Sequence, residues 1–429
     1  MERQFIDSGT KGIGLIPASW ESQPLVIFFA ENRMANSNLD SVTALQFKYG
    51  EIIQKPSNGR DLNDKDKELL SKYTVIEPGD VVVNGLNLNF DLKSLRIAIA
   101  REKGVITSAY IVLRPRNDVN SEYYNYVLKA LDFQKILHGM GEGIRLTLSY
   151  DELKKIVVPA PKASIQSAIV DYLKEKCGEI DSLIGLQEQM IEKLKAYKQS
   201  VITEAVTKGL NPNAKLVPSN IDWIGEIPEE WKVVRVKNLF VLRTGTTPKE
   251  FEQGLDSDSL VNWFTPSDVA EMNCELSSSE RHLSKTVVAK EGIELNPTGS
   301  LVFVGIGASA GKIGYAKVEG YSNQQITSLV PKEGRCYSKY CYYYMIADRK
   351  RIRDNAFFTT LPIINNTYLS GVKTLLPPLE EQQAVASYLD EKCSEIDNLI
   401  AVNQQKIEKL KDYKKSVIYE TVTGKTDFA

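Results

Sequence analysis

The chain contains a long internal repeat, and this feature constrains its architecture more than any other. Segments 169–210 and 385–426 align without a gap at an offset of 216 residues, and 24 of the 42 aligned positions are identical. A shorter repeat lies upstream of each, because residues 13–20 (IGLIPASW) match residues 224–231 (IGEIPEEW). Such self-similarity indicates two copies of one structural unit. We therefore expect a pseudo-twofold chain in which a short opening motif, a long divergent region and a similar closing segment occur twice.

The two closing segments predict long helices that pair with each other. Both lack proline and are rich in good helix formers. Apolar residues recur at alternating steps of three and four over about five heptads, which is typical of a coiled-coil seam. The predicted seam consists of Leu173, Cys177, Ile180, Ile184, Gln187, Ile191 and Leu194 in the first segment and of Leu389, Cys393, Ile396, Ile400, Asn403, Ile407 and Leu410 in the second.

An antiparallel pairing of these helices would match their polar positions. Gln187 would then meet Asn403, Lys198 would lie opposite Cys393, and Lys414 would lie opposite Cys177. A buried amide layer can set the register of a coiled coil at some cost in stability. The alternative is that each long helix packs on some other core.

The divergent regions predict two compact mixed domains of about 140 residues each, a usual domain size. Short apolar runs at 81–83 and 301–304 read as strands, and residues 123–137 and 339–353 as helices. The predicted fold class is α+β: two mixed α/β domains joined by two long helices that form an antiparallel coiled coil. The predicted boundaries are 1–160 for the first domain, 161–210 for the first helix, 211–376 for a linker and the second domain, and 377–429 for the second helix and tail.

A basic cluster on the predicted helix 339–353 is a candidate for contacting nucleic acid. Arg349, Lys350, Arg351 and Arg353 follow a run of tyrosines. Basic side chains at this density suit phosphate oxygens, which position a protein on DNA without reading its sequence. The alternative is an ordinary solvated helix face. The chain as a whole has a net charge of -2, which argues against a protein that coats nucleic acid over its entire surface.

Polar loops are the candidates for contacts with base edges, because amide side chains can pair bidentately with adenine. Loops of this composition also form plain turns. The candidate residues are Asn84, Asn87, Asn89, Lys93, Arg96 and Arg145 in the first domain and Thr244, Thr246, Ser309, Lys312, Asn323, Gln324 and Gln325 in the second.

Motifs that would indicate an enzyme are incomplete. Gly305, Gly307 and Ala310 match the spacing of a dinucleotide fingerprint, but a strand-like pattern follows where a helix should begin. The sequence up to Lys312 is one residue short of a P-loop, and Ile313 stands where a serine or threonine should bind magnesium. The chain has two histidines, so metal sites and nucleophilic triads have little support. We expect no catalytic residues and no metal site.

Cysteine content and hydropathy favour a cytoplasmic protein. Five cysteines in 429 residues do not make a disulfide framework and fit a reducing compartment. No run of 18 apolar residues occurs, so a membrane span is not expected.

In combination, these features resemble the specificity subunits of type I restriction-modification systems along almost the whole chain. The second long helix opens with PPLEEQQ at 377–383, and the pattern YLxxKxxxIDxLI covers 172–184 and 388–400 in corresponding positions of the two copies. The domain entry at 224–231, the glycine-rich segment 305–314 and the amides at 323–325 are also typical of that family. The first copy departs from the pattern at 159–166, where the Glu-Gln pair is missing.

The resemblance implies that the mixed domains are target-recognition domains. Each would read one half of a bipartite, asymmetric site in double-stranded DNA, and the helices would hold them apart. Two methyltransferase (modification) subunits would bind this chain and methylate adenine with S-adenosylmethionine. A restriction/translocase subunit that uses ATP and magnesium would be a further partner, so this chain itself would bind no cofactor. The competing hypothesis is a non-enzymatic two-domain coiled-coil adaptor that binds protein partners.

Overall fold

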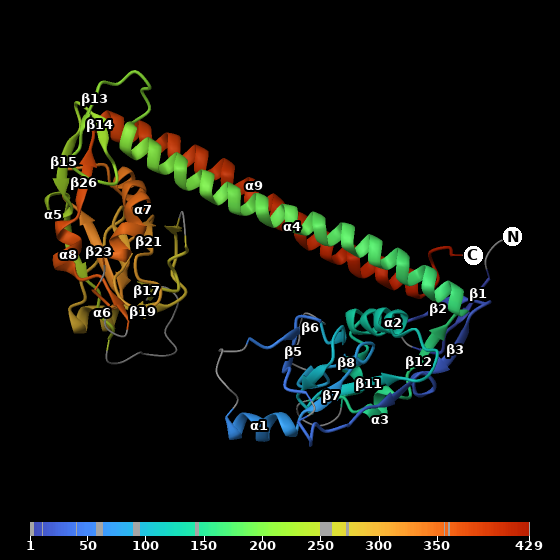
Figure 1. Ribbon diagram of the computed structural model, residues 1–429. Coiled ribbons are helices and arrows are strands. Elements are labelled where there is room, and N and C mark those ends of the chain that lie inside the picture. Colours follow the sequence, from blue (N-terminus) through green and yellow to red (C-terminus); the bar gives the residue numbers. More distant parts are fainter. Residues whose placement is uncertain are drawn as a thin grey trace. The chain divides into compact units, whose positions relative to one another are not determined.

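The chain forms two compact units, each built around one of the divergent regions. The computed structural model describes residues 4–10, 12–39, 41–56, 63–88, 95–141, 146–248, 260–271, 274–355, 357–358 and 361–428. The first unit comprises residues 1–188 with 405–429, and the second comprises residues 189–404. Each unit therefore contains one mixed α/β domain and a part of both long helices (Figure 1).

The two long helices are α4 (Ala163–Lys208) and α9 (Leu379–Val422). Within each unit they run antiparallel, as predicted. In the first unit Lys414 Nζ lies 2.7 Å from Asp181 Oδ1, and in the second unit Lys198 Nζ lies 2.7 Å from Asp397 Oδ1. All residues of the predicted seam are buried or half-buried.

The polar positions of the seam divide between the two units. Burial raises the pKa of the Cys393 thiol to about 11, and the nearby Lys198 ammonium opposes that rise, so this lysine lies beside the predicted cysteine. Gln187 belongs to the first unit and Asn403 to the second. The Asn403 amide donates to the Leu399 carbonyl of its own helix at 2.7 Å. The predicted amide layer stays a prediction.

The first unit is built on a four-stranded antiparallel sheet in the order β4-β11-β8-β9. Its elements are β1 (Phe5–Asp7), β2 (Leu15–Pro17), β3 (Glu21–Pro24), η1 (Leu25–Ile27), β4 (Phe29–Glu31), β5 (Leu45–Lys48), β6 (Glu51–Gln54), α1 (Asp64–Ser71), β7 (Thr74–Ile76), β8 (Val81–Val83), β9 (Ile97–Ile99), β10 (Gly104–Ile106), β11 (Ile111–Pro115), α2 (Ser121–Phe133), η3 (Leu137–Met140), α3 (Tyr150–Leu153) and β12 (Val157–Ala160).

Strand β8 shows why this sheet is buried on both faces. Side chains alternate across a strand. Val81 and Val83 belong to the core that α2 and the long helices share, whereas Val82 belongs to a second core with Leu45 and Ile106. A strand covered on both sides reads as a continuous apolar run, which explains the sequence Val-Val-Val.

The second unit repeats this arrangement with additions. Its five-stranded sheet has the order β16-β23-β20-β21-β18, so the first four strands follow the order of the first unit and β18 is extra. Its elements are β13 (Leu216–Pro218), β14 (Glu226–Pro228), β15 (Lys232–Arg235), α5 (Val236–Leu239), β16 (Phe240–Thr244), β17 (Leu260–Phe264), β18 (Cys274–Leu276), β19 (His282–Ser284), α6 (Lys285–Glu291), β20 (Leu301–Val304), β21 (Ile313–Ala316), β22 (Tyr321–Ser322), β23 (Ile326–Pro331), α7 (Ser338–Asp354), β24 (Phe357–Phe358), β25 (Pro362–Ile363), α8 (Asn366–Gly371) and β26 (Lys373–Leu376).

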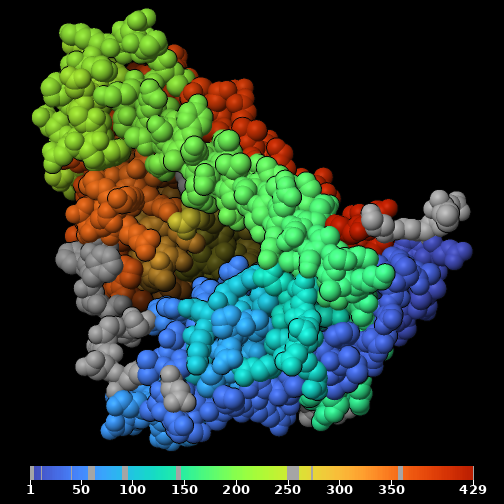
Figure 2. All heavy atoms as spheres, turned by 45° about the vertical axis from the view of Figure 1, so that its right-hand side comes forward, coloured from blue at the N-terminus to red at the C-terminus, as the bar shows by residue number. Residues whose placement is uncertain are grey.

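Helices α2 and α7 connect each domain to the long helices. Both begin at a serine and carry buried tyrosines, among them Tyr123 in α2 and Tyr340 in α7. The Tyr340 hydroxyl donates to the Val206 carbonyl of α4 at 3.2 Å. In the space-filling view the start of α4 lies on the turquoise surface that contains α2 (Figure 2). No helix among the described residues is both long and apolar enough to cross a membrane.

Candidate nucleic-acid interface

In the second unit the candidate loops lie at one end of the sheet. Strands β16 and β20 end there, at Thr244 and Val304, and the antiparallel strands β21 and β23 begin there, at Ile313 and Ile326. The loop after β16, the glycine-rich segment 305–312 and the turn 323–325 are therefore neighbours. Sequence segments up to 80 positions apart supply one surface because of this strand order.

Hydrogen bonds join these loops to one another. The Thr246 amide donates to the Ser322 carbonyl at 2.8 Å, and the Gly305 amide donates to the Gln325 carbonyl at 2.8 Å. A Cβ atom at Gly245 would lie 2.2 Å from the Asn323 carbonyl oxygen. Only glycine fits at this close approach of two backbones.

Asn366 connects the same loops and was not predicted from the sequence. Its Nδ2 donates to Thr244 Oγ1 at 2.9 Å, and its Oδ1 accepts from Thr327 Oγ1 at 2.7 Å. The sequence offered no signal, because Asn366 opens α8, far along the chain from either partner. It fixes Thr244 at the end of β16.

The amide triplet divides into structural and exposed members. Asn323 is buried, its Oδ1 accepts from the Gln325 amide at 3.1 Å, and its Nδ2 donates to Gln325 Oε1 at 3.2 Å. This residue therefore shapes the turn, and its contact with bases stays a prediction. Gln324 is exposed and shares a hydrogen bond with Thr247.

The predicted basic cluster on α7 also divides. Arg351 Nε donates to Asp348 Oδ1 at 2.6 Å, and Arg349 pairs with Glu271. Burial raises the pKa of the Asp348 carboxyl, and the Arg351 guanidinium opposes that rise. Arg351 is thus needed to neutralise a buried acid. Lys350 and Arg353 are exposed.

Arg353 joins the cluster to the glycine-rich loop. A Cβ atom at Gly311 would lie 3.3 Å from Arg353 Cβ, so the loop and the end of α7 are in contact. Lys312 of this loop pairs with Glu271 at 3.4 Å, and Ser309 is half-buried with its carbonyl accepting from the Lys312 amide at 3.2 Å. Glu271 therefore holds two of the predicted cations, Lys312 and Arg349.

In the first unit the corresponding loop surrounds a buried arginine. Arg96 is 4% exposed, and its Nη1 donates to the carbonyls of Asn84 and Leu86 at 2.9 and 2.7 Å. Its Nη2 donates to the Asn87 carbonyl at 3.1 Å. The Arg96 guanidinium thus supports the loop from inside, and the contact of Arg96 with DNA stays a prediction. Asn84 is half-buried in the same loop, and Asn87 is exposed with a φ of 52°. Asn89, Lys93 and Arg145 lie outside the described residues.

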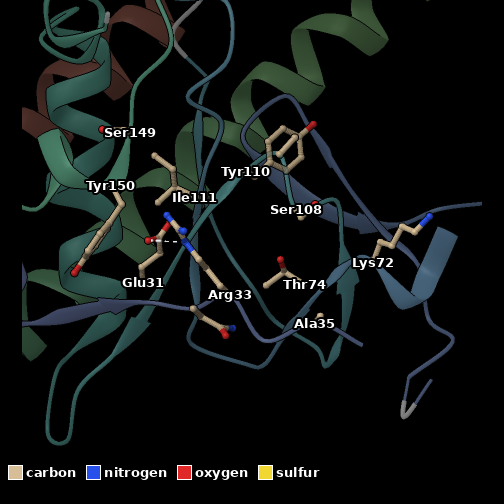
Figure 3. A pocket seen from close by; sticks show the side chains of 12 residues that line it. Glu31, Arg33, Ala35, Lys72, Thr74, Ser108, Tyr110, Ile111, Ser149 and Tyr150 are labelled. Carbon is tan, nitrogen blue, oxygen red and sulfur yellow. Dashed lines mark ion pairs between the residues drawn. The ribbon is translucent and has the colours of Figure 1, made fainter. Parts of the chain in front are cut away.

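A pocket at the same end of this sheet was missed by sequence reasoning. It has a volume of about 350 Å³ and is lined by residues of the β4 end, the end of α1, the loop before β11 and the start of α3. Figure 3 shows Arg33 and Glu31 on one side of it and Tyr110 with Ser108 on the other. Arg33 Nε lies 2.9 Å from Glu31 Oε2, and the Arg33 side chain is 80% exposed. These residues are single polar positions beside separate elements, so no local pattern marks them.

Comparisons with known proteins find the same kind of relative over most of the chain. Residues 228–412 match the family model described as type I restriction modification DNA specificity domain. The MjaVIII type I restriction enzyme specificity subunit of Methanocaldococcus jannaschii is 26% identical over 377 residues, which cover 83% of each chain. The putative MjaX specificity subunit of the same organism is 22% identical over 96% of this chain and 95% of that protein. In sequence, this chain is similar to the specificity subunits of type I restriction-modification systems.

A solved structure has the same fold as this chain. The match is a chain from a study of complex assembly and conformational transition in the type I restriction-modification system. It has a TM-score of 0.69 at 15% identity and covers 96% of this chain and 99% of that chain. The resemblance stated from the sequence motifs is confirmed.

The chain thus carries a corresponding loop surface in each unit. Both surfaces lie where β4 and β16 end and where β11 and β23 begin. Their described side chains differ, with Arg33, Asn87 and Tyr110 in the first unit and Gln324 and Arg353 in the second. Among the residues that the structure describes, no group of three or more His, Cys, Asp or Glu side chains is placed to hold a metal ion.

Proposed function

We propose that this specificity subunit recognises a bipartite, asymmetric site in double-stranded DNA, with each unit reading one half. One observation carries the proposal: equivalent sheet ends in the two units present polar loops of different composition. Equivalent placement favours the same kind of ligand, and different side chains favour different half-site sequences, because sequence is read by side chains on base edges.

The exposed residues divide into two expected roles. Lys350 and Arg353 suit phosphate oxygens, which set position and make binding salt-dependent. Thr246, Gln324 and Asn87 suit base edges, because hydroxyl and amide groups both donate and accept hydrogen bonds. Arg33 and Tyr110 at the pocket of the first unit offer a further guanidinium and a phenol to the same ligand.

A specificity subunit is the non-catalytic DNA-recognition component of its complex. Its partners are accordingly DNA and the other subunits. We infer two modification subunits that bring S-adenosylmethionine and flip the target adenine out of the duplex. A restriction/translocase subunit would bring ATP and magnesium. All five cysteines are free thiols, which supports a cytoplasmic complex. Nothing in the described residues favours the adaptor hypothesis.

The test is methylation directed by this chain. It would be co-expressed with the neighbouring methyltransferase in a host without adenine methylation, and the host genome would be read by single-molecule sequencing. We expect a split methyladenine motif that is present only with this chain. A stable complex with an active methyltransferase and no methylated motif would contradict the proposal.

A matched pair of variants links that motif to the loop surface. Lys350→Glu with Arg353→Glu places two acidic groups on the surface of the second unit and should abolish methylation. Lys409→Glu changes an exposed lysine of α9 and should leave the motif and its methylated fraction unchanged.

A further inference from the structure

Each mixed domain contacts a long helix through an ion pair at the start of its main helix, and the polarity of that pair is reversed between the two units. In the first unit Glu122, the second residue of α2, pairs with Lys174 of α4. In the second unit Lys339, the second residue of α7, pairs with Asp390 of α9, with Nζ 3.3 Å from Oδ1. The domain supplies the anion in one unit and the cation in the other.

The two pairs occupy equivalent places. Lys174 and Asp390 are separated by 216 residues, which is the offset of the repeat. Next to them, Tyr126 of α2 lies near Cys177, and Tyr343 of α7 lies near Cys393. These two cysteines are separated by the same offset, so the reversal of charge occurs beside a repeated tyrosine–cysteine contact. In the second unit the Tyr343 hydroxyl also donates to Asp390.

The charged residues around each pair differ between the two units in accordance with the polarity of the pair. In the first unit Arg101 also pairs with Glu122. Lys317 stands 216 residues later, and a lysine at position 339 beside it would bring two cations together. Glu275 prevents this, because it pairs with Lys339 and lies 2.6 Å from Lys317 Nζ. Glu275 belongs to β18, the strand that is added to the sheet of the second unit.

Both central residues are shielded from solvent to a large extent. The side chain of Lys339 is 5% exposed, and its Nζ lies 4.6 Å from the centre of the Tyr315 ring. Burial raises the pKa of the Glu122 carboxyl, but hydrogen bonds from Lys174 and Arg101 outweigh it, and the net change is a decrease. A partly desolvated charge that faced a like charge would be costly.

We propose that these contacts are two seats of opposite polarity, which fix each recognition domain on its own long helix and reject the domain of the other unit. A domain that carries Glu122 would meet the carboxylate of Asp390 at the seat on α9. A domain that carries Lys339 would meet the ammonium of Lys174 at the seat on α4. Specificity that uses repulsion as well as attraction is a general device of paired modules. The inference concerns how the units are built and does not depend on the DNA function.

The test exchanges the two residues of the long helices in the full chain: the aspartate of α9 is placed at position 174 of α4, and the lysine of α4 at position 390 of α9. Hydrogen–deuterium exchange of α2 and α7, followed by mass spectrometry, reports how firmly each domain is held. Lys174→Asp should accelerate exchange in α2 by about threefold, the size expected for a partly exposed pair, and leave α7 unchanged. Asp390→Lys should accelerate exchange in α7 and leave α2 unchanged. Lys176→Asp alters a half-buried neighbour that pairs with Glu179, and Glu391→Lys alters an exposed neighbour; neither should change exchange in α2 or α7.

A charge-swapped variant distinguishes an effect of charge polarity from the loss of a side-chain contact alone. Adding Arg101→Glu and Glu122→Lys to Lys174→Asp recreates the polarity of the second unit in the first, and exchange in α2 should return to the parent rate. Lys174→Ala, which removes the attraction without adding repulsion, should fall between the parent and Lys174→Asp. Equal effects of the alanine and aspartate variants, or failure of the rescue in a chain with parent-like exchange in α7, would overturn the proposal.

Discussion

Lys198 of α4 donates to both carboxylate oxygens of Asp397 of α9, each at 2.7 Å. The equivalent contact in the first unit joins Lys414 to Asp181, also at 2.7 Å to both oxygens. The two contacts differ in burial, because the Lys198 side chain is 3% exposed and that of Lys414 is 30% exposed. Equivalent ion pairs therefore stand in unequal environments.

This inequality predicts unequal costs for removing the two carboxylates. Asp397→Ala leaves a buried ammonium without its anion and should destabilise the chain by about 2 kcal/mol. Asp181→Ala leaves a partly solvated ammonium and should cost about 0.5 kcal/mol. Urea unfolding followed by far-ultraviolet circular dichroism measures both. Glu192→Ala, which breaks an exposed pair on α4, serves as the control, and equal losses for the two aspartates would contradict the burial argument.

Much of the fold was predictable because period and repetition are properties of the sequence. The seam residues follow alternating steps of three and four, and the proline-free segments placed α4 and α9 to within a few residues of their observed starts. Strand β8 was visible as a short valine run. Strand order was not predictable, because non-local pairings such as β4 with β11 and β16 with β23 depend on tertiary packing.

The candidate site was predictable at the level of loops and not of side chains. The polar composition of the loops after β8, β16 and β20 predicts a binding surface, and these loops lie at one end of each sheet. Composition cannot distinguish an exposed arginine such as Arg353 from a buried one such as Arg96. That difference arises from whether nearby carbonyls point inward to receive the guanidinium, which only the folded loop decides.

Replacing Arg96 is therefore expected to lower the free energy of unfolding of the first unit. Arg96→Met keeps most of the side-chain volume but leaves the carbonyls of Asn84, Leu86 and Asn87 without their donor. The first unit should lose about 3 kcal/mol, because charged hydrogen bonds disappear and buried acceptors remain. Arg116→Met removes one exposed guanidinium hydrogen bond to the Val26 carbonyl and should cost under about 1 kcal/mol. Urea unfolding reports both, and a stable Arg96→Met variant that loses only DNA binding would contradict the assignment.

Lys350 and Arg353 are expected to matter for affinity and salt dependence. Replacing both by alanine should weaken binding to the cognate DNA and reduce the slope of log affinity against log salt by about 2, one for each phosphate that is no longer neutralised. The decrease in affinity should be similar on cognate and unrelated duplexes, because phosphate contacts carry little sequence information. Titration of the assembled methyltransferase complex at several salt concentrations measures this. An unchanged slope would exclude these side chains from the interface, and Lys409→Ala is the matched control.

Cys336 is expected to be the thiol of the second unit that reacts first with iodoacetamide. A hydrogen bond from the Cys341 thiol lowers the pKa of Cys336 below its usual 9.0, against the opposing effect of burial. Burial raises the pKa of Cys393 to about 11. The thiolate is the reactive form, so the modification rate of half-buried Cys336 should reach half its maximum below pH 9, whereas that of Cys393 should stay low until about pH 11.

Cys341→Ala tests the cause of this reactivity. Without the hydrogen bond only burial acts on the Cys336 thiol, so its pKa should rise and the pH profile of its modification should move to higher pH. Peptide mapping by mass spectrometry over a pH series gives the rate at each cysteine separately. Because Cys341 is itself fully buried, Cys341→Ser is a second variant that keeps a donor in place and should leave the Cys336 profile near that of the parent. A profile that stays unchanged in Cys341→Ala would show that exposure alone sets the reactivity of Cys336.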